Sequence, residues 1–281
     1  LAGNSQNDYD WIAQHTCTEP DASTPTEYVA DWGLGTHNRR FASDERAGIN
    51  RENVARLELA WSLAFPKVSD MRSQPAIIGD TLYFGDKAGK LYALDRTRGC
   101  VRAHAKVFSG IRSAITVATL SDGKQLLVFA DSVATVFAVD PQTLDIVWQQ
   151  PVCLFETSVV TGSISYYDDR LFVPVSSFEV AAAGSPSHIC CKSHGGVIAL
   201  DANNGERLWQ WHATDEAVLQ GQNADGQDQF GPSGAAVWTT PALRVDRHRR
   251  EPQPSGDRHF RCHHRTGHGQ RRNGLALPGH V

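Results

Sequence analysis

Three stretches of the chain repeat one pattern: KLYALDRTRGCVRA (90–103), TVFAVDPQTLDIVWQ (135–149) and GVIALDANNGERLWQ (196–210). Each contains Ala-x-Asp, with a turn residue four positions after the Asp and a Trp position eight after it. The aspartates are Asp95, Asp140 and Asp201, the turn residues are Gly99, Leu144 and Gly205, and the Trp positions hold Ala103, Trp148 and Trp209. A pattern that recurs at intervals of 45 and then 61 residues indicates a repeat architecture.

Short alternating runs precede each copy. PAIIGDTLYFGDKAGKLYALD (75–95) predicts three strands joined by tight turns, and the residues after the Asp-to-Gly turn supply a fourth. Four antiparallel strands per unit are typical of a propeller blade. The fold class predicted is therefore all-β, a β-propeller of four-stranded blades, of which about four are readable.

Two segments depart from the regular spacing. The third copy follows an insertion of about 16 residues, which we place between Phe172 and Val197. Loops inserted into a rigid scaffold often carry binding function. NVARLELAWSLAF (53–65) has the pattern of an outer strand without inner strands of its own, and we expect it to pair with a final blade from the far end of the ring.

The composition is that of an ordinary globular chain, with 41% hydrophobic and 21% charged residues. No apolar run is long enough for a membrane span, and residues 1–25 lack the order of a signal peptide, although a leader preceding Leu1 is compatible with the sequence. The six cysteines are too few for a disulfide scaffold, and none shows the CxxC or CxxCH spacing of zinc or c-type haem sites.

The net charge of the chain changes sign at about Leu243. Residues 244–281 hold nine Arg, no Lys, three acids and six His, a formal +6 against −10 for the rest. This tail shows neither strand nor helix periodicity. Back-translated and shifted by one base, it permits AIIALDMANGEMDW, a further copy of the repeat, so we interpret residues 244–281 as an out-of-frame or disordered tail.

Two other interpretations of the tail are weaker. A basic arm that binds nucleic acid would use such charge, but the complete absence of Lys argues against it. The tail also gathers four metal-ligand types, without a second ligand pair at zinc spacing: Cys262, His263, His264 and His268.

The repeat, the opening DWGLGTHNRRFASDERAGINRENVARLELAW (31–61) and GPSGAAVWTTPAL (231–243) together resemble the pyrroloquinoline-quinone (PQQ) dependent alcohol dehydrogenases. The loop with ICCKSHGG resembles the polyvinyl-alcohol dehydrogenase branch. The resemblance implies an eight-bladed propeller of which about half is present. It divides the chain into an N-terminal extension (1–30), a partial propeller (31–243) and the tail (244–281).

The resemblance also implies site residues. It assigns Arg112, Thr161, Ser176 and Trp238 to cofactor binding, Trp238 as the floor under the quinone ring, and Glu179 to calcium. For each, an ordinary structural role is the alternative: a surface Arg, a turn Thr, a core Trp or a solvated loop Glu. A carboxylate directly after an apolar strand suits bidentate calcium binding.

Cys190 and Cys191 are adjacent. Consecutive Cα atoms lie about 3.8 Å apart, less than the usual disulfide range of roughly 4.4–6.8 Å, so a bond between them would close a strained, rigid ring. The resembled family uses such a vicinal disulfide as a lid over its cofactor, and two free thiols are the alternative.

The sequence and the resemblance support two alternative functions. In the first, the chain is a quinoprotein, or a fragment of one, that oxidises alcohols, polyvinyl alcohol among them. Its cofactors are PQQ and Ca²⁺, and the resemblance adds an electron-accepting cytochrome c and a periplasmic or secreted location. Its catalytic base lies beyond the readable frame. In the second, the chain is a non-catalytic propeller of the same repeats that binds protein as a scaffold, with no need for the Cys190–Cys191 pair, Glu179 or GAAVW.

Overall fold

The structure is a computed structural model, and it describes residues 5–18, 28–29, 32–34 and 39–242. The predictions made for residues 244–281 lie outside the described residues. No helix in the described part is long and apolar enough to cross a membrane.

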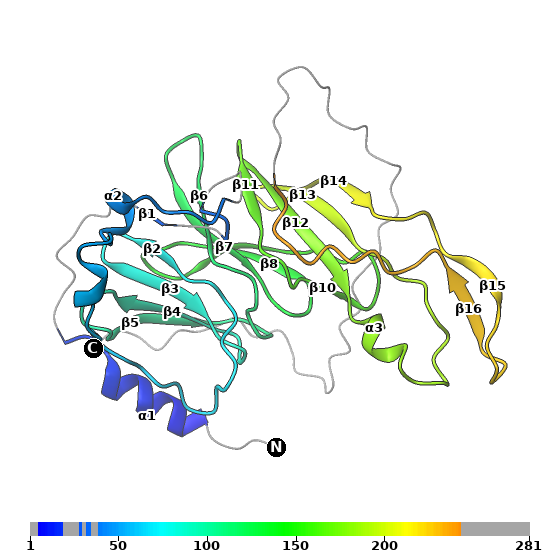
Figure 1. Cartoon of the computed structure of the whole chain (residues 1–281), viewed down its shortest axis with the longest axis horizontal. Coiled ribbons are helices and arrows are strands. Elements are labelled where there is room, and N and C mark those ends of the chain that lie inside the picture. The colour runs from blue at the N-terminus through cyan, green and yellow to red at the C-terminus, as the bar shows by residue number, and fades with distance from the viewer. Residues whose placement is uncertain (1–4, 19–27, 30–31, 35–38, 243–281) are drawn as a thin grey trace.

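Three antiparallel sheets lie side by side, each with the four strands expected of a blade (Figure 1). The first sheet contains β2 (Ala76–Ile78), β3 (Thr81–Gly85), β4 (Lys90–Asp95) and β5 (Val101–Lys106), and the short β1 (Tyr28–Val29) pairs with β2 as a fifth strand. The second contains β6 (Thr116–Thr119), β7 (Gln125–Ala130), β8 (Thr135–Val139) and β9 (Ile146–Pro151). The third contains β10 (Ser158–Val159), β11 (Ser165–Tyr167), β12 (Arg170–Ser177), β13 (Gly196–Asp201) and β14 (Arg207–His212). In the third sheet β10 and β11 pair with opposite ends of β12, so together they form its innermost position. These are propeller blades, and three of the roughly four expected are complete in the described chain.

The repeated Ala-x-Asp motif builds the turn between the last two strands of each blade. The side chain of Asp95 accepts the backbone N–H groups of Thr97 and Arg98, which fixes an Asx turn. Four residues on, Gly99 has φ of 74° and donates its N–H to the Asp95 carbonyl. The same bond forms in the other two blades, and the turn residues there also have positive φ: Leu144 with 59° and Gly205 with 77°.

Side chains that alternate along the strands of the middle blade are apolar on both faces of its sheet. In β7, Leu127 and Phe129 belong to the core shared with the first blade, while Leu126 and Val128 belong to the core shared with the third. All four side chains are fully buried. A strand covered on both faces is continuously apolar, which explains the run QLLVFA.

Tryptophans clamp neighbouring segments onto the repeat turns. Trp148, at the end of the second blade, donates its indole N–H to the carbonyl of Ala202 in the third blade, at 3.0 Å. Its ring lies so close to Gly205 that a Cβ there would come within 2.6 Å. Trp61 makes the equivalent contacts with Arg96 and Gly99 of the first blade.

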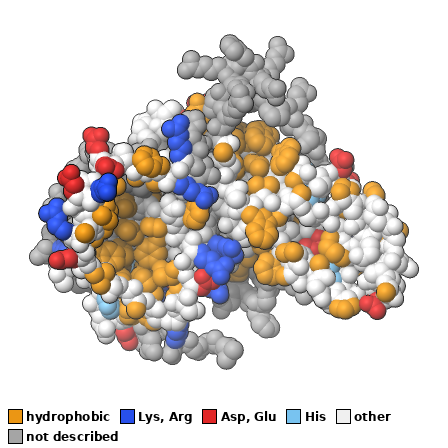
Figure 2. Space-filling model, in the orientation of Figure 1, with side chains coloured by type: hydrophobic (Ala, Val, Ile, Leu, Met, Phe, Trp, Pro, Cys, Tyr) orange, Lys and Arg blue, Asp and Glu red, His pale blue; other side chains and the backbone are white. Residues whose placement is uncertain are grey.

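Between the first and second blades, an alanine and a leucine take the place of the tryptophan and the glycine. Ala103 stands at the Trp position, and Leu144 stands where the other turns have glycine. Both pack in the core between these blades, and Leu144 is buried. The leucine side chain therefore compensates for the missing indole. Beyond Trp209 the described chain offers no further turn of this kind, and Leu208 and Trp211 of β14 are exposed. Figure 2 shows groups of apolar side chains at the surface in one view of the molecule.

The N-terminal segment covers the free face of the first blade. Residues 57–65 form no strand, contrary to the outer-strand prediction, because no further blade in the described chain offers them a partner edge. Instead Trp61 and Phe65 pack with Ile12 of α1 (Ser5–His15) against the first blade. A disulfide between Cys17 and Cys100, with Cα atoms 5.1 Å apart, ties this segment to the blade. Sequence spacing gave no indication of that bond.

The shorter elements flank these sheets. They are α2 (Asp44–Ala47), a 3₁₀ turn (Val54–Arg56), α3 (Glu179–Ala182), and a hairpin of β15 (Val218–Gln222) and β16 (Asp228–Gly231). The insertion occupies residues 178–195, between β12 and β13, as predicted. It begins with α3 and carries Cys190 and Cys191.

The Trp148 clamp predicts unequal costs for two glycine substitutions. Gly205→Ala and Gly226→Ala both place a side chain at φ near 77°, which costs about 1–2 kcal/mol. Among the described residues, a ring lies against Gly205, whereas no atom lies within 4 Å of a Cβ at Gly226. Urea denaturation should therefore show Gly205→Ala less stable by a further 1–3 kcal/mol, roughly the cost of overpacking. Equal losses would contradict the clamp.

Candidate functional site

The head of each blade places one side chain toward a common cleft. Arg72, Arg112 and Thr161 each precede the first full strand of a blade by four residues, ahead of β2, β6 and β11. All three line one cavity of about 300 Å³, which we call the arginine cleft. Trp238 lines it too, and stands four residues ahead of Ala242 in a Pro-Ala step like that at the start of β2.

The arginine cleft is cationic. Arg40 also lines it, with its guanidinium carbon 5.4 Å from the centre of the Trp32 ring. Arg72 pairs with Asp70 at 2.7 Å, and no described acid pairs with Arg112. Three guanidinium groups thus face the cleft, and no carboxylate is among the described side chains that line it. Such a cleft attracts anions, and arginine suits bidentate carboxylate binding.

Two threonine hydroxyls in this cleft have no partner. The Oγ1 atoms of Thr161 and Thr240 are buried and make no hydrogen bond to any described residue. A buried hydroxyl without a partner costs about 1–3 kcal/mol. Donors of this kind beside three guanidinium groups fit a ligand that carries carboxylates.

Trp238 stands between this cleft and a second cavity, and 61% of its side chain is exposed. Two glycines allow its segment to approach the third blade. A Cβ at Gly162 would lie 2.8 Å from the Trp238 carbonyl, and one at Gly195 would lie 2.5 Å from the Ala235 carbonyl. The backbone of Trp238 therefore lies against the third blade, while its indole ring stays exposed and available for stacking.

The second cavity, of about 460 Å³, lies beneath the insertion, and we call it the disulfide cavity. Cys191 and Glu179 line it, and Cys190 and Cys191 are joined as a disulfide, as the resemblance implied. The structure thus brings Arg112, Thr161 and Trp238 together in one cleft, and Glu179, Cys191 and Trp238 in the other.

Ser176 lines neither cavity. Its side chain is 3% exposed within β12, where it pairs with Val159. Its neighbour Ser177 faces the disulfide cavity instead, because adjacent side chains of a strand point to opposite faces. Ser177 Oγ lies 2.7 Å from the hydroxyls of Thr157 and Ser193.

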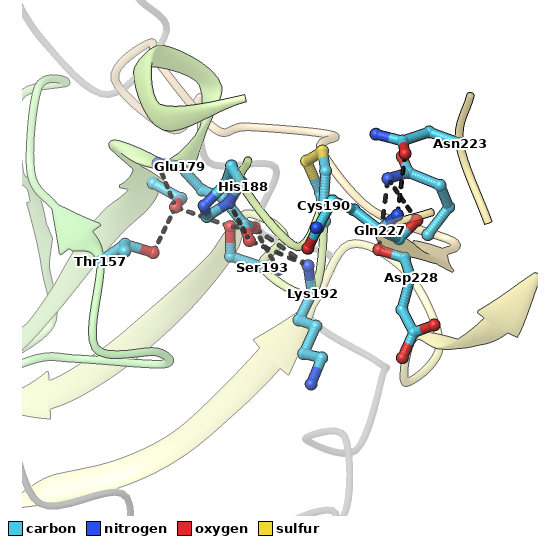
Figure 3. The surroundings of a disulfide bond; sticks show 12 residues. Thr157, Glu179, His188, Cys190, Lys192, Ser193, Asn223, Gln227 and Asp228 are labelled. Atoms are coloured by element: carbon cyan, nitrogen blue, oxygen red, sulfur yellow. Dashed lines mark hydrogen bonds and ion pairs between the residues drawn. A yellow bond between two sulfur atoms is a disulfide. The ribbon is translucent and has the colours of Figure 1, made fainter. Parts of the chain in front are cut away.

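Glu179 is surrounded by donors (Figure 3). Its carboxylate accepts the backbone N–H of Lys192 at 3.0 Å and of Ser193 at 2.7 Å, the Ser193 hydroxyl, and Nε2–H of His188 at 3.3 Å. Burial alone would raise the pKa of Glu179, but the hydrogen bonds from Ser193, Lys192 and His188 outweigh it and lower that pKa. The carboxylate is therefore ionised and already well satisfied.

These surroundings do not fit a calcium ion. Calcium takes six to eight oxygen ligands in proteins. The metal-ligand types near the Glu179 oxygens are a nitrogen of His188 and the sulfur of Cys191, which is already bonded to Cys190. The described residues thus offer one carboxylate whose oxygens already face N–H and O–H groups, which is not a ligand set for calcium.

Comparison with known proteins finds two kinds of similarity. The family described as "Outer membrane protein assembly factor BamB" matches residues 34–169. The polyvinylalcohol dehydrogenase of Sphingopyxis sp. (strain 113P3) is 32% identical over 231 residues, and that of a Pseudomonas sp. is 31% identical over 227, each match covering 79% of this chain. Over most of its length the chain is similar to these polyvinylalcohol dehydrogenases. It spans 35% of the length of both relatives.

A solved quinoprotein alcohol dehydrogenase shows a weaker likeness. The quinohemoprotein alcohol dehydrogenase from Comamonas testosteroni gives a TM-score of 0.49 at 18% identity, over 78% of this chain and 30% of that one.

The site contains residues that sequence analysis missed: Trp32, Arg40, Arg72, Ser177, Ser193 and Thr240. One signal would have found Arg72. It occupies the same blade-head position as Arg112, four residues before a first strand, and the repeat register alone relates the two. The others depend on loop geometry that no pattern in this sequence reveals.

The unpartnered hydroxyl of Thr161 predicts opposite effects for two similar substitutions. Thr161→Val removes a hydroxyl that has no partner, and should raise the free energy of unfolding by about 1 kcal/mol. Thr116→Val removes a hydroxyl that donates to the Ile164 carbonyl at 2.9 Å, and should lower the free energy of unfolding by a similar amount. Urea denaturation of both variants checks this. Equal destabilisation would show that Thr161 is satisfied in solution.

Proposed function

We propose that this chain forms part of a PQQ-dependent alcohol dehydrogenase and that its arginine cleft holds the carboxylates of the quinone. The observation that carries the proposal is the convergence of three guanidinium groups and two unpartnered hydroxyls beside an exposed indole. PQQ is a flat tricarboxylate, and these groups supply the cations, donors and stacking surface it requires.

Each residue has a role that its position supports. Arg112, with Arg40 and Arg72, neutralises the carboxylates, and Thr161 and Thr240 donate hydrogen bonds to them. Trp238 supports the ring between the two cavities. When bound, the quinone accepts two electrons and two protons from an alcohol, which becomes an aldehyde or ketone.

The disulfide cavity supplies space for the alcohol. Val180, Ala183, Ala235 and Ala236 give it an apolar wall beside Trp238. Small aliphatic side chains suit an aliphatic chain, and two relatives are named polyvinylalcohol dehydrogenases. We propose secondary alcohols, polyvinyl alcohol included, as the substrate class, and a cytochrome c as the electron acceptor.

The Cys17–Cys100 and Cys190–Cys191 disulfides support an oxidising compartment, in agreement with a periplasmic or secreted location. Calcium, the other cofactor predicted from the sequence, has no complete ligand set among the described residues.

A scaffold function is the second candidate, and the match of residues 34–169 to the family described as "Outer membrane protein assembly factor BamB" favours it. A protein-binding scaffold has no use for three arginines around two unpartnered hydroxyls. Quinone binding therefore discriminates between the two functions.

Titration of the chain with PQQ, followed by tryptophan fluorescence, tests the proposal. We expect saturable quenching, because Trp32 and Trp238 border the cleft. Arg112→Gln should weaken binding at least about tenfold, since a charge-assisted hydrogen bond contributes about 1.5–3 kcal/mol. Arg96→Gln, which changes a surface arginine paired with Asp80, is the matched control. Absence of quenching, or equal weakening by both variants, would favour the scaffold.

A further inference from the structure

The vicinal disulfide is held from two sides. On one side, Cys190 accepts the N–H of Phe230 and Cys191 donates to the Phe230 carbonyl, so the pair lies along β16 (Figure 3). On the other side, the next two residues, Lys192 and Ser193, donate their N–H groups to Glu179. The loop therefore spans from the hairpin to the first residue of α3.

The contact at Glu179 has the features of an anion-binding loop. Two successive backbone N–H groups converge on one carboxylate, and the Ser193 hydroxyl adds a third donor. Successive N–H groups of this kind bind anions, and here the anion belongs to the chain itself. Hydrogen bonds to an ionised acceptor are roughly twice as strong as neutral ones.

The contact continues into the third blade. Ser193 Oγ also lies 2.7 Å from Ser177 Oγ, which is 2.7 Å from the hydroxyl of Thr157 and accepts the Glu179 N–H at 3.0 Å. Glu179 is 8% exposed and Ser193 5% exposed. A buried network fixed to β12 at Ser177 can therefore set the position of the insertion relative to the blade.

We infer that Glu179 is a positioning residue, which fixes the Lys192–Ser193 backbone and thereby holds the Cys190–Cys191 disulfide as the wall of the disulfide cavity. This assigns to the carboxylate a role different from the cation ligation that the resemblance implied. It concerns an internal contact of the loop and does not require PQQ to bind, so it can fail or hold independently of the proposed function.

Hydrogen exchange of the Lys192 and Ser193 amides tests the inference, together with the rate at which dithiothreitol reduces Cys190–Cys191, followed by peptide mass spectrometry. Glu179→Gln keeps the shape and removes the charge, and it should speed both processes at least about tenfold. Ser193→Ala removes one donor and should have a smaller effect in the same direction. Glu206→Gln, an exposed acid in the turn between β13 and β14, should have none.

The Cys17–Cys100 disulfide serves as an internal reference, because its reduction rate should stay unchanged in Glu179→Gln. If that rate rises equally, the variant has unfolded and Ser193→Ala carries the test. The unsubstituted chain is also measured with millimolar Ca²⁺ and with a chelator, and neither should change its rates. Unchanged exchange in Glu179→Gln and Ser193→Ala, or protection by Ca²⁺ that Glu179→Gln abolishes, would overturn the inference.

Discussion

The packing of one blade's apolar face onto the next is the interaction on which the rest of this structure depends. Each four-stranded sheet is too small to bury its own faces, so the middle blade is buried between its two neighbours, and the N-terminal segment covers the other face of the first blade. The indole of Trp148 joins the second blade to the third at Gly205, and Ala103 and Leu144 join the first blade to the second. Residues from the heads of all three blades line one cleft.

The sequence predicted what the repeat determines. The blades, the Asp turns and the position of the insertion follow from local patterns of two-residue alternation and turn chemistry, and the structure confirms them. Residues 53–65 were predicted as a strand because the alternation is there, but a strand also needs a partner edge. The Cys17–Cys100 bond was missed because the two cysteines come together only when α1 folds back.

The site was predictable where the repeat register or the family resemblance supplied a position. Arg112, Thr161 and Trp238 line one cleft, and Arg72 shares the register of Arg112 and Thr161. Ser176 shows the limit of a motif, since strand alternation turns Ser177 and not Ser176 toward the cavity. Glu179 lines the disulfide cavity, and two of the donors that surround its carboxylate are backbone N–H groups, which side-chain patterns do not reveal.

The central claim is that the arginine cleft recognises the carboxylates of a quinone. Isothermal titration of the chain with PQQ and with its trimethyl ester tests this most directly, because the ester keeps the ring system and removes the charges. The account predicts saturable binding of PQQ that weakens with added salt, and at least about a hundredfold weaker binding of the ester, the loss of two charge-assisted contacts. Equal affinity for the two compounds would contradict it.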